Sequence, residues 1–552
     1  MHPTEKPQAP PALTTDRRSI LAAGLFGMAG LPAAANASAF QRARGFTHNV
    51  ASGEPAANSV LLWTRFRPAS GEPAMLRFEV SDAIDFARVV SSGEVEASPD
   101  RDWCVKAIAS GLSPNRWYYF RFIAPDGAMS PFGRTRTLPQ GGIDKWRMAV
   151  FACSNLGFGW FNAYAHAAEA GDFDCVLHTG DYIYEYPQGT YPSPSQTQNG
   201  RVLDPAHEIV ALADYRMRYA AYRSDPDLQR IHQLFPMIPV PDDHEFTNDP
   251  WKDGAQNHQP ETEGSWEVRK ATALRVYREW MPISDALWES YQIGDLVTLF
   301  RIETRITARD KQFSYSELLS GLEPGPEWDA KLSAFRDGKW RDASRTLLGS
   351  EQESWLSGGM AASVRSGRKW QVLLQQVIMA ELYADPSLAE NIPAEASEFI
   401  SSRLRNRALV ANQGLPLNMD AWDGYPAARE RLLNSARDAD ANLVVLTGDT
   451  HNAWASELGG AGIEFAGQSV TSPGMENSLG WIPPDQLARS LVSNSEQLKW
   501  VNTHQRGYMV LELTPQRATS EWRFMETIRQ RTTTLAGTHR VSSELGSQRL
   551  TV

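Results

Sequence analysis

The sequence has few of the features that mark disulfide-rich, membrane-spanning or nucleic-acid-binding proteins. Its 552 residues include only 3 cysteines, so a disulfide framework is excluded and at least one thiol is unpaired. Beyond residue 39 there is no apolar run of about 18 residues, so we expect no transmembrane segment in the mature protein. The formal net charge of −11 argues against a basic face for nucleic acid, although a locally positive pocket stays possible.

What the sequence does contain is enough apolar material for a large core. Hydrophobic residues make up 42% of the chain and tryptophan occurs 18 times, which excludes a disordered protein. A length of 552 residues predicts two or more domains.

The first 39 residues have the pattern of an export signal. The pair Arg17-Arg18 precedes an apolar run over residues 20–31, and an alanine-rich segment over residues 33–39 suits signal-peptidase cleavage. An arginine pair before a moderately apolar run is typical of bacterial twin-arginine signals. The alternatives are an ordinary secretory signal or a chance pair of arginines. We therefore expect residues 1–39 to be removed, the twin-arginine export machinery to be a partner, and the protein to be periplasmic or secreted.

Residues 40–139 predict an all-β sandwich of the fibronectin or immunoglobulin type. Short β-rich runs occur at residues 59–65, 75–80 and 116–122, and glycine, proline, asparagine and serine separate them. In the stretch 111–119 we expect a tyrosine to fix a corner before the last of these runs. A linker follows at residues 138–143.

The pattern changes after residue 145, where strand and helix signals alternate. Residues 146–153, 161–170 and 173–179 predict strand, helix and strand, and residues 426–437 and 443–447 predict a further helix and strand. This alternation predicts an α/β domain with parallel strands over residues 145–552. The polar segments 307–345 and 383–425 are expected to be insertions or lids around a site.

Four apolar runs each end at residues that bind metals. Ligands of open α/β sheets lie beyond the carboxyl ends of the strands. A single Gly-Asp after a strand is more often a turn, but four coincident strand ends predict a metal site. Carboxylates suit calcium, magnesium, manganese or ferric iron, whereas thiolate and imidazole favour iron or zinc, so two or more unlike metals are expected. The residues are Cys153, Asp181, Tyr184, Asp242, Asp243, His244, Asp449 and His451.

An ordered set of motifs extends this pattern over most of the chain. The motifs are VASGEP (50–55), LWTR (62–65), GDYIYE (180–185), DDHE (242–245), LGSEQ (348–352), AWDGY (421–425), GDTHN (448–452) and SVTSPG (469–474). In the identity and order of these motifs, the sequence resembles the alkaline phosphatase D, or PhoD-like, branch of the calcineurin-type metallophosphoesterases. The resemblance implies a β-sandwich in front of a four-layer αββα catalytic domain. It also implies hydrolysis of phosphomonoesters or phosphodiesters, with iron (Fe³⁺) and calcium as cofactors; Mn, Zn, Mg and Co are further possibilities.

The resemblance also assigns roles to individual residues. It implies that Cys153, Tyr184 and His451 bind the iron, that Asp181 bridges the metals, and that Asp243 and Asp449 lie on the side of the second metal. It places His244 beside the substrate phosphate, with Asp242 next to the site in a role left open. The chain departs from the family at Ala152 and Pro241, which leaves the ligands in place and puts the substrate range in doubt.

The expected mechanism is attack of a metal-activated hydroxide on phosphorus, in line with the leaving group. His244, Asp243 and Arg305 are the catalytic candidates: His244 protonates the leaving group or holds a phosphate oxygen. Arg305 is either a phosphate clamp or a structural ion pair with Glu303 or another acid.

Four further residues have weaker assignments. Asn257 and His258 line the pocket or, more simply, belong to a solvated loop. Asp423 is a turn residue or a functional one. Cys104 and Cys175 are expected to be core residues.

The sequence thus predicts an exported phosphatase or phosphodiesterase that acts on small phosphoesters and supplies phosphate. One alternative is a diesterase of the phospholipase D type, which would need an apolar mouth. Another is an exported surface-binding protein without activity, which the loss of a ligand would have supported.

Overall fold

The computed structural model describes residues 44–321, 325–390, 392–394, 396 and 398–552. The expected signal peptide, residues 1–39, lies outside the described residues. None of the described helices is long and apolar enough to cross a membrane.

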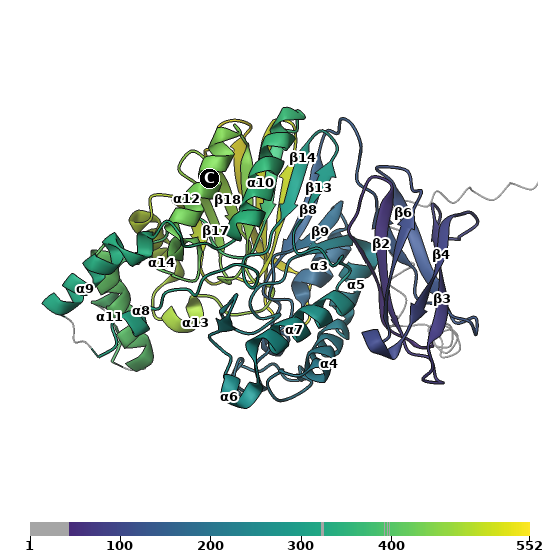
Figure 1. The fold of residues 1–552 in the computed structure, drawn as a ribbon, viewed down its shortest axis with the longest axis horizontal. Coiled ribbons are helices and arrows are strands. Elements are labelled where there is room, and N and C mark those ends of the chain that lie inside the picture. The colour runs from purple at the N-terminus through teal and green to yellow at the C-terminus, as the bar shows by residue number, and fades with distance from the viewer. Residues whose placement is uncertain (1–43, 322–324, 391, 395, 397) are drawn as a thin grey trace, which may run out of the picture.

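The N-terminal region is a sandwich of two antiparallel layers (Figure 1). One layer contains β1 (Phe46–Gly53), β2 (Ser59–Phe66) and β5 (Cys104–Ser110); the other has the order β4-β3-β6-β7, with β3 at Ala74–Ser81, β4 at Val89–Ala97, β6 at Trp117–Ile123 and β7 at Gly133–Arg136. Side chains such as Val60, Leu62 and Phe120 fill the space between the layers. The expected corner is present, because the Tyr118 hydroxyl accepts a hydrogen bond from the backbone N–H of Ser113 at 2.9 Å.

The first of the two large sheets of the α/β region has nine strands, in the order β22-β21-β20-β8-β9-β10-β1-β2-β5. Its central strands β8 (Trp146–Phe151), β9 (Cys175–His178) and β10 (Pro236–Pro239) are parallel, and β20 (Gly507–Leu513), β21 (Arg517–Met525) and β22 (Leu535–Glu544) extend it antiparallel. In the register Phe151 pairs with His178, and His178 with Pro239. The carboxyl ends of these three strands are therefore level with one another.

The sandwich is joined to this sheet by backbone hydrogen bonding. Ser52 and Gly53 of β1 pair in parallel with Pro236 and Met237 of β10. One layer of the sandwich is thus continuous with the sheet that carries the candidate site.

The second large sheet has seven strands, in the order β13-β14-β15-β16-β18-β17-β19. Strands β14 (Val297–Arg301), β15 (Trp370–Leu374), β16 (Leu443–Thr447) and β18 (Gly462–Ala466) are parallel; β13 (Glu289–Ile293), β17 (Ala453–Glu457) and β19 (Leu498–Asn502) run antiparallel to their neighbours. A short hairpin of β11 (Pro250–Trp251) and β12 (Gly254–Ala255) lies in the segment after β10.

The two sheets face each other across an apolar layer to which Met148, Leu177, Val372 and Leu446 belong. Helices α3 (Asn162–Ala170), α4 (Leu212–Arg223), α5 (Pro226–Leu234) and α7 (Trp266–Trp280) pack on the outer face of the first sheet. Helices α10 (Gly349–Arg365), α12 (Pro426–Asp438) and α14 (Pro484–Asn494) pack on the second. These are the four αββα layers, and the predicted fold class is confirmed.

The predicted elements around the site also agree with the structure. Helix α3 ends where Gly171 adopts a left-handed conformation, with φ of 64°, and its N–H bonds back to Ala167. Strand β8 stops at Phe151, two residues before the expected end. The chain therefore leaves the sheet before Cys153, which lies in the loop after β8.

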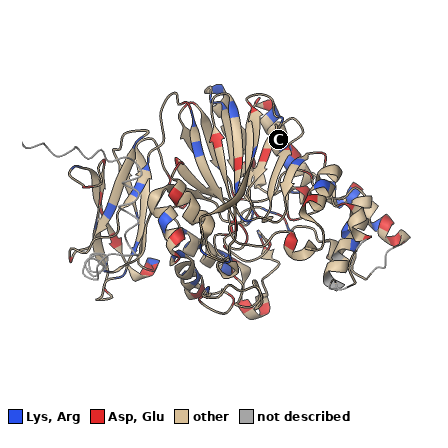
Figure 2. Ribbon diagram, turned by 180° about the vertical axis from the view of Figure 1, so that it is seen from behind, with Lys and Arg blue, Asp and Glu red and all other residues tan. Residues whose placement is uncertain are grey.

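The segments expected to be insertions form a small helical lobe at one end of the molecule (Figure 1). It contains α8 (Tyr315–Leu318), α9 (Pro326–Asp337) and α11 (Glu398–Asn412), and it has its own core with Leu332, Trp340 and Val410. The remaining short helices are α6 (Pro260–Glu263) and α13 (Glu476–Leu479). Acidic and basic residues are interspersed over the sheets and this lobe (Figure 2).

Candidate metal centre

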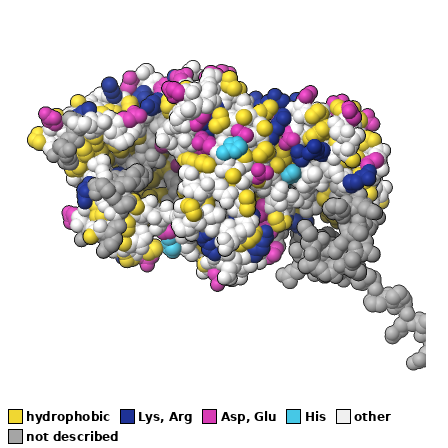
Figure 3. Space-filling model, turned by 90° about the horizontal axis from the view of Figure 1, so that it is seen from below, with side chains coloured by type: hydrophobic (Ala, Val, Ile, Leu, Met, Phe, Trp, Pro, Cys, Tyr) yellow, Lys and Arg dark blue, Asp and Glu magenta, His cyan; other side chains and the backbone are white. Residues whose placement is uncertain are grey.

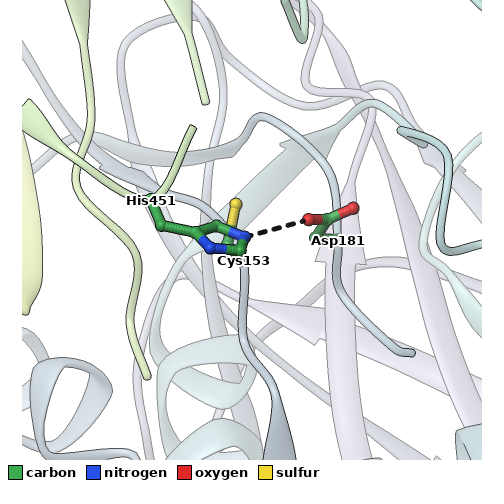
Figure 4. Close-up of side chains that lie close together, drawn as sticks. All are labelled: Cys153, Asp181 and His451. Carbon is green, nitrogen blue, oxygen red and sulfur yellow. Dashed lines mark ion pairs between the residues drawn. The ribbon is translucent and has the colours of Figure 1, made fainter. Parts of the chain in front are cut away.

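The four predicted strand ends meet at one place, beyond the carboxyl ends of strands from both sheets. Within each of three groups, the potential ligand atoms all lie within 4.8 Å of one another. The groups are Cys153–Asp181–His451, Asp181–Asp243–His244 and Asp242–Asp243–Asp449. Asp181 belongs to the first two groups and Asp243 to the last two, so the groups form one continuous centre. Figure 4 shows the first group, in which His451 Nε2 lies 3.8 Å from Asp181 Oδ2.

Backbone conformation directs these side chains inward. Cys153, Asp181, Asp449 and His451 have φ angles of 56°, 56°, 60° and 64°. Residues other than glycine rarely adopt this left-handed region, at a cost on the order of 1–3 kcal/mol each. The fold therefore holds four residues, at the ends of the three strands β8, β9 and β16, in a disfavoured conformation.

Gly180 shows why a glycine precedes Asp181. Its φ is +106°, and a Cβ on this residue would lie 2.3 Å from the Cβ of Asp242. Only a residue without a side chain lets the loop after β9 approach the loop after β10 this closely.

Hydrogen bonds fix the ligand atoms of the first group. His451 Nδ1 lies 2.7 Å from the carbonyl oxygen of Pro473, so Nδ1 carries the hydrogen and the lone pair of Nε2 faces the centre. The Tyr184 hydroxyl lies 2.9 Å from Asp181 Oδ2, 3.3 Å from His451 Nε2 and 2.6 Å from Ser472 Oγ. The structure thus brings Tyr184 to the same group.

Burial controls the protonation of this group. It raises the pKa of the Cys153 thiol and of the Tyr184 hydroxyl well above their usual values, and the nearby charge of Asp181 adds to both effects. Burial also raises the pKa of Asp181 and lowers that of His451 to about 4. Without a cation, burial thus favours the protonated forms of Cys153, Tyr184 and Asp181 and the neutral form of His451, so metal binding by the first three would release protons.

Arg305 lies at the centre of the aspartate group and is fully buried. Its Nε lies 2.5 Å from Asp242 Oδ1, and its two terminal nitrogens lie 2.7 Å from Asp420 Oδ2 and 2.9 Å from Asp449 Oδ1. This geometry matches the structural ion pair, and it engages each of the three guanidinium nitrogens in a bond to an aspartate. Asp420, which leads from the helical lobe, is a partner that the sequence did not indicate.

Glu303, the ion-pair partner considered from the sequence, has another role. Its carboxylate accepts hydrogen bonds from the backbone N–H groups of Arg305, Ile306 and Thr307 at 2.5, 2.8 and 2.9 Å. It therefore shapes the turn after β14.

His244 is held by Glu185, a residue that the sequence-based interpretation quoted within a motif but gave no role. His244 Nδ1 lies 2.7 Å from Glu185 Oε2, and Nε2 lies 3.8 Å from Asp243 Oδ2. Burial alone would lower the pKa of His244, but the charges of Asp243 and Glu185 raise it well above its usual value. Glu185 also accepts a hydrogen bond from Asn257 Nδ2 at 3.0 Å.

The structure places the remaining candidates away from a ligand role. Asn257 is half-buried and supports Glu185, whereas His258 is buried 3.0 Å from Glu263, so the expectation of a solvated loop was wrong for His258. The Asp423 carboxylate accepts hydrogen bonds from Arg429 at 2.7 Å and from the N–H of Leu382 at 3.0 Å. Cys104 and Cys175 are buried core residues, as predicted.

The donor set fits metal ions. Asp181 Oδ1 and Asp242 Oδ2 are buried and have no hydrogen-bond partner among the described residues. A buried carboxylate oxygen without a partner is costly, and a cation is the ligand that removes this cost. Asp181 belongs to the group with Cys153, and Asp242 belongs to the group with Asp449. Both parts of the centre therefore have a buried oxygen that a cation would suit.

Two facing sheets with candidate metal ligands beyond their strand ends are the arrangement of a metallophosphoesterase-like protein. Comparison with known families agrees. Residues 148–522 match the PhoD-like phosphatase family, and residues 32–139 match its N-terminal domain. The chain belongs to the PhoD-like phosphatase family and is a phosphoric ester hydrolase. Family membership argues against the alternative of an exported binding protein without activity.

Individual relatives support the same assignment. The chain is 34% identical over 511 residues to alkaline phosphatase D of Bacillus subtilis (strain 168). The aligned region covers 87% of this chain and 77% of that protein. The solved structure of PhoD matches with a TM-score of 0.72 and 30% identity over 92% of each chain. A purple acid phosphatase, PPD1, from yellow lupin (Lupinus luteus) seeds matches with a TM-score of 0.51 and 12% identity over 89% of this chain and 73% of that one. At that identity it supports the fold alone.

Proposed function

We propose that the protein hydrolyses phosphomonoesters, phosphodiesters or both at a centre that holds iron and calcium. The observation that supports this most directly is the chain of three ligand groups joined through Asp181 and Asp243. In this proposal Cys153, Tyr184 and His451 hold iron, and Asp243 and Asp449 hold calcium. Thiolate, phenolate and imidazole beside one carboxylate suit iron, whereas a group of carboxylates suits calcium.

Metal ions bound here would activate water near neutral pH and offset the charge that develops on phosphate oxygens. The protein's own part is to fix the geometry of the reacting groups. Glu185 holds the His244 ring through Nδ1, so Nε2 is the atom that faces the centre. The raised pKa of His244 leaves a proton on Nε2. His244 can then donate that proton to the leaving oxygen or hold a phosphate oxygen.

Arg305 and Asp242 have supporting roles in this proposal. Arg305 offsets the negative charge of Asp242 and Asp449 and holds Asp420 at the edge of the centre. Asp242 Oδ1 binds Arg305, which leaves Oδ2 free to contribute to the aspartate group.

The phospholipase D-type alternative has less support. In the face shown in Figure 3, hydrophobic side chains of the described residues are interspersed with charged and other polar ones. A substrate with lipid tails would need a continuous apolar mouth. We therefore propose small phosphoesters as the substrates.

Purified protein assayed on a chromogenic phosphomonoester and a chromogenic phosphodiester tests the reaction. We expect hydrolysis that is lost on chelation and restored by added metal. His258→Ala is the control for His244→Ala, because His244 faces the centre whereas His258 pairs with Glu263. Only His244→Ala should reduce the rate of hydrolysis. Equal activity of the His244→Ala variant and the wild-type enzyme would contradict the role of His244.

We also propose that residues 1–39 direct export by the twin-arginine route and that the enzyme supplies phosphate outside the cytoplasm. The supporting observation is Arg17-Arg18 before an apolar run and an alanine-rich segment. Replacing both arginines by lysine should retain the protein in the cytoplasm. Unchanged export of that variant would exclude the twin-arginine route.

A further inference from the structure

Glu245 is a fully buried carboxylate at the edge of the metal centre, and it is not among the proposed ligands. It accepts three backbone hydrogen bonds. Oε1 accepts the N–H of Tyr182 at 2.5 Å, and Oε2 accepts the N–H of Asp181 at 3.1 Å and of Asp242 at 2.7 Å. Two of the three donors are the N–H groups of proposed centre residues.

The donors come from two separate loops. Asp181 and Tyr182 follow β9, whereas Asp242 follows β10. The N–H of Val240 still bonds to the carbonyl of His178, in continuation of the strand pairing. Past that point the loops diverge from strand geometry, and Glu245 binds both of them.

The two loops are also in close contact here. A Cβ on Gly180 would lie 2.3 Å from the Cβ of Asp242, so the loops touch beside the Glu245 carboxylate. Oε2 of Glu245 alone binds one N–H from each loop. The position of Glu245 therefore sets how far Asp181 lies from Asp242 and Asp243.

We propose that Glu245 is a positioning residue that fixes the spacing between Asp181 and the aspartate group, and thereby the calcium affinity of the centre. A carboxylate only accepts hydrogen bonds, and it has two acceptor oxygens for the three donors. A glutamine has one such oxygen, so its NH₂ group would face the N–H of Tyr182 or those of Asp181 and Asp242. This inference rests on the proposed metal-dependent hydrolysis.

Glu464 provides a matched control. It is also a fully buried glutamate whose carboxylate accepts backbone N–H groups, those of Met379 at 2.7 Å and Ala380 at 2.9 Å. Its donors lie in the loop after β15, which carries none of the proposed ligands. Glu464→Gln should therefore destabilise the fold without moving the metal ligands.

The experiment is a calcium titration of wild-type, Glu245→Gln and Glu464→Gln protein after chelation, with both the melting temperature and the hydrolysis rate as readouts. For Glu245→Gln we expect the half-saturating calcium concentration to rise about 10–100-fold in both readouts. For Glu464→Gln we expect a lower melting temperature at every calcium concentration and an unchanged half-saturating concentration. If Glu245→Gln does not fold, Glu245→Asp replaces it, because the shorter carboxylate cannot reach both loops.

Two results would overturn the positioning role. In one, Glu245→Gln has the half-saturating calcium concentration of the wild type; in the other, Glu464→Gln shifts it equally. The wild-type titration tests the proposed function separately. If wild-type protein shows no calcium-dependent hydrolysis, the proposed function fails, whereas a normal wild-type titration confines any failure to the role of Glu245.

Discussion

The two halves of the metal centre balance their charges in different ways. In the Cys–His half (Cys153, Asp181, Tyr184 and His451) the acidic groups bond to one another, as the Tyr184 hydroxyl does to Asp181 at 2.9 Å. In the aspartate half (Asp242, Asp243 and Asp449) the buried Arg305 bonds directly to two of the three acids. The difference teaches that, among the described residues, one half offers its acidic groups no arginine or lysine as a direct partner, so the proposed metal would balance their charge, whereas the other half shares a built-in cation.

The shared carboxylate should show the largest effect. Asp181 lies in the proposed iron group and beside Asp243 in the adjoining group, and the family resemblance implies that it bridges the metals, so Asp181→Ala should lose both metals. We expect kcat/KM to fall by about 10³-fold or more, since metal ions contribute several kcal/mol to catalysis. Elemental analysis and rate measurements check this. Full retention of both metals would show that the halves do not share Asp181.

Removal of the built-in cation should cost stability. In Arg305→Gln, Asp242, Asp449 and Asp420 lose a buried partner, which we expect to lower the free energy of unfolding by about 3–5 kcal/mol. Added calcium should recover part of this loss, because a second cation offsets the same acids.

Arg429→Gln is the control for that variant, because it breaks a buried pair with Asp423 outside the centre. Denaturant titrations with and without calcium should show recovery for Arg305→Gln alone. If Arg305→Gln instead keeps its stability and raises KM, Arg305 is a phosphate clamp.

Single-ligand variants should separate the halves. Cys153→Ser should reduce iron affinity about 100-fold or more and keep calcium, whereas Asp449→Asn should do the reverse. Metal analysis after dialysis measures both. Loss of the same metal in both variants would contradict the division into halves.

The smallest predicted effect lies outside the centre and depends on pH. Burial raises the pKa of Glu464 from 4.5 to about 7. The folded state thus binds the Glu464 proton more tightly than the unfolded state does. The stability that this proton contributes is fully present below pH 4.5 and is lost as the pH rises through about 7. Between pH 4.5 and 8, the free energy of unfolding should fall by roughly 1–3 kcal/mol more in the wild type than in Glu464→Gln. Equal slopes of stability against pH would contradict this.

The sequence predicted which side chains come together because strand ends have local signals. Apolar runs that stop at Gly180-Asp181 or Gly448-Asp449 give both the strand and its end, and parallel pairing then brings the ends together. The chain also belongs to the family that the ordered motifs indicated. The α/β class with parallel strands followed from the alternation of strands and helices, whereas the four-layer arrangement was implied by the family resemblance.

What the sequence did not predict depends on contacts between distant segments. Arg305 pairs with Asp242, Asp420 and Asp449, which lie 63, 115 and 144 residues away. The neighbour in sequence, Glu303, bonds to the backbone instead. No local pattern marks Asp420, which lies in an irregular segment between α11 and α12.

The same limit applies to the sandwich. The linker at residues 138–143 has a local signal in proline and glycine. The pairing of Ser52 and Gly53 with Pro236 and Met237 joins strands more than 180 residues apart. Such a register is set by tertiary packing and has no counterpart in local composition.

Elemental analysis of the purified mature protein, paired with a chelator-sensitive assay on a phosphomonoester and a phosphodiester, tests the central claim most directly. We predict iron together with calcium, hydrolysis that chelation abolishes, and loss of both metals and activity in Asp181→Ala. Protein that hydrolyses neither ester when both metals are bound, or that hydrolyses an ester in the absence of metal, would contradict the account.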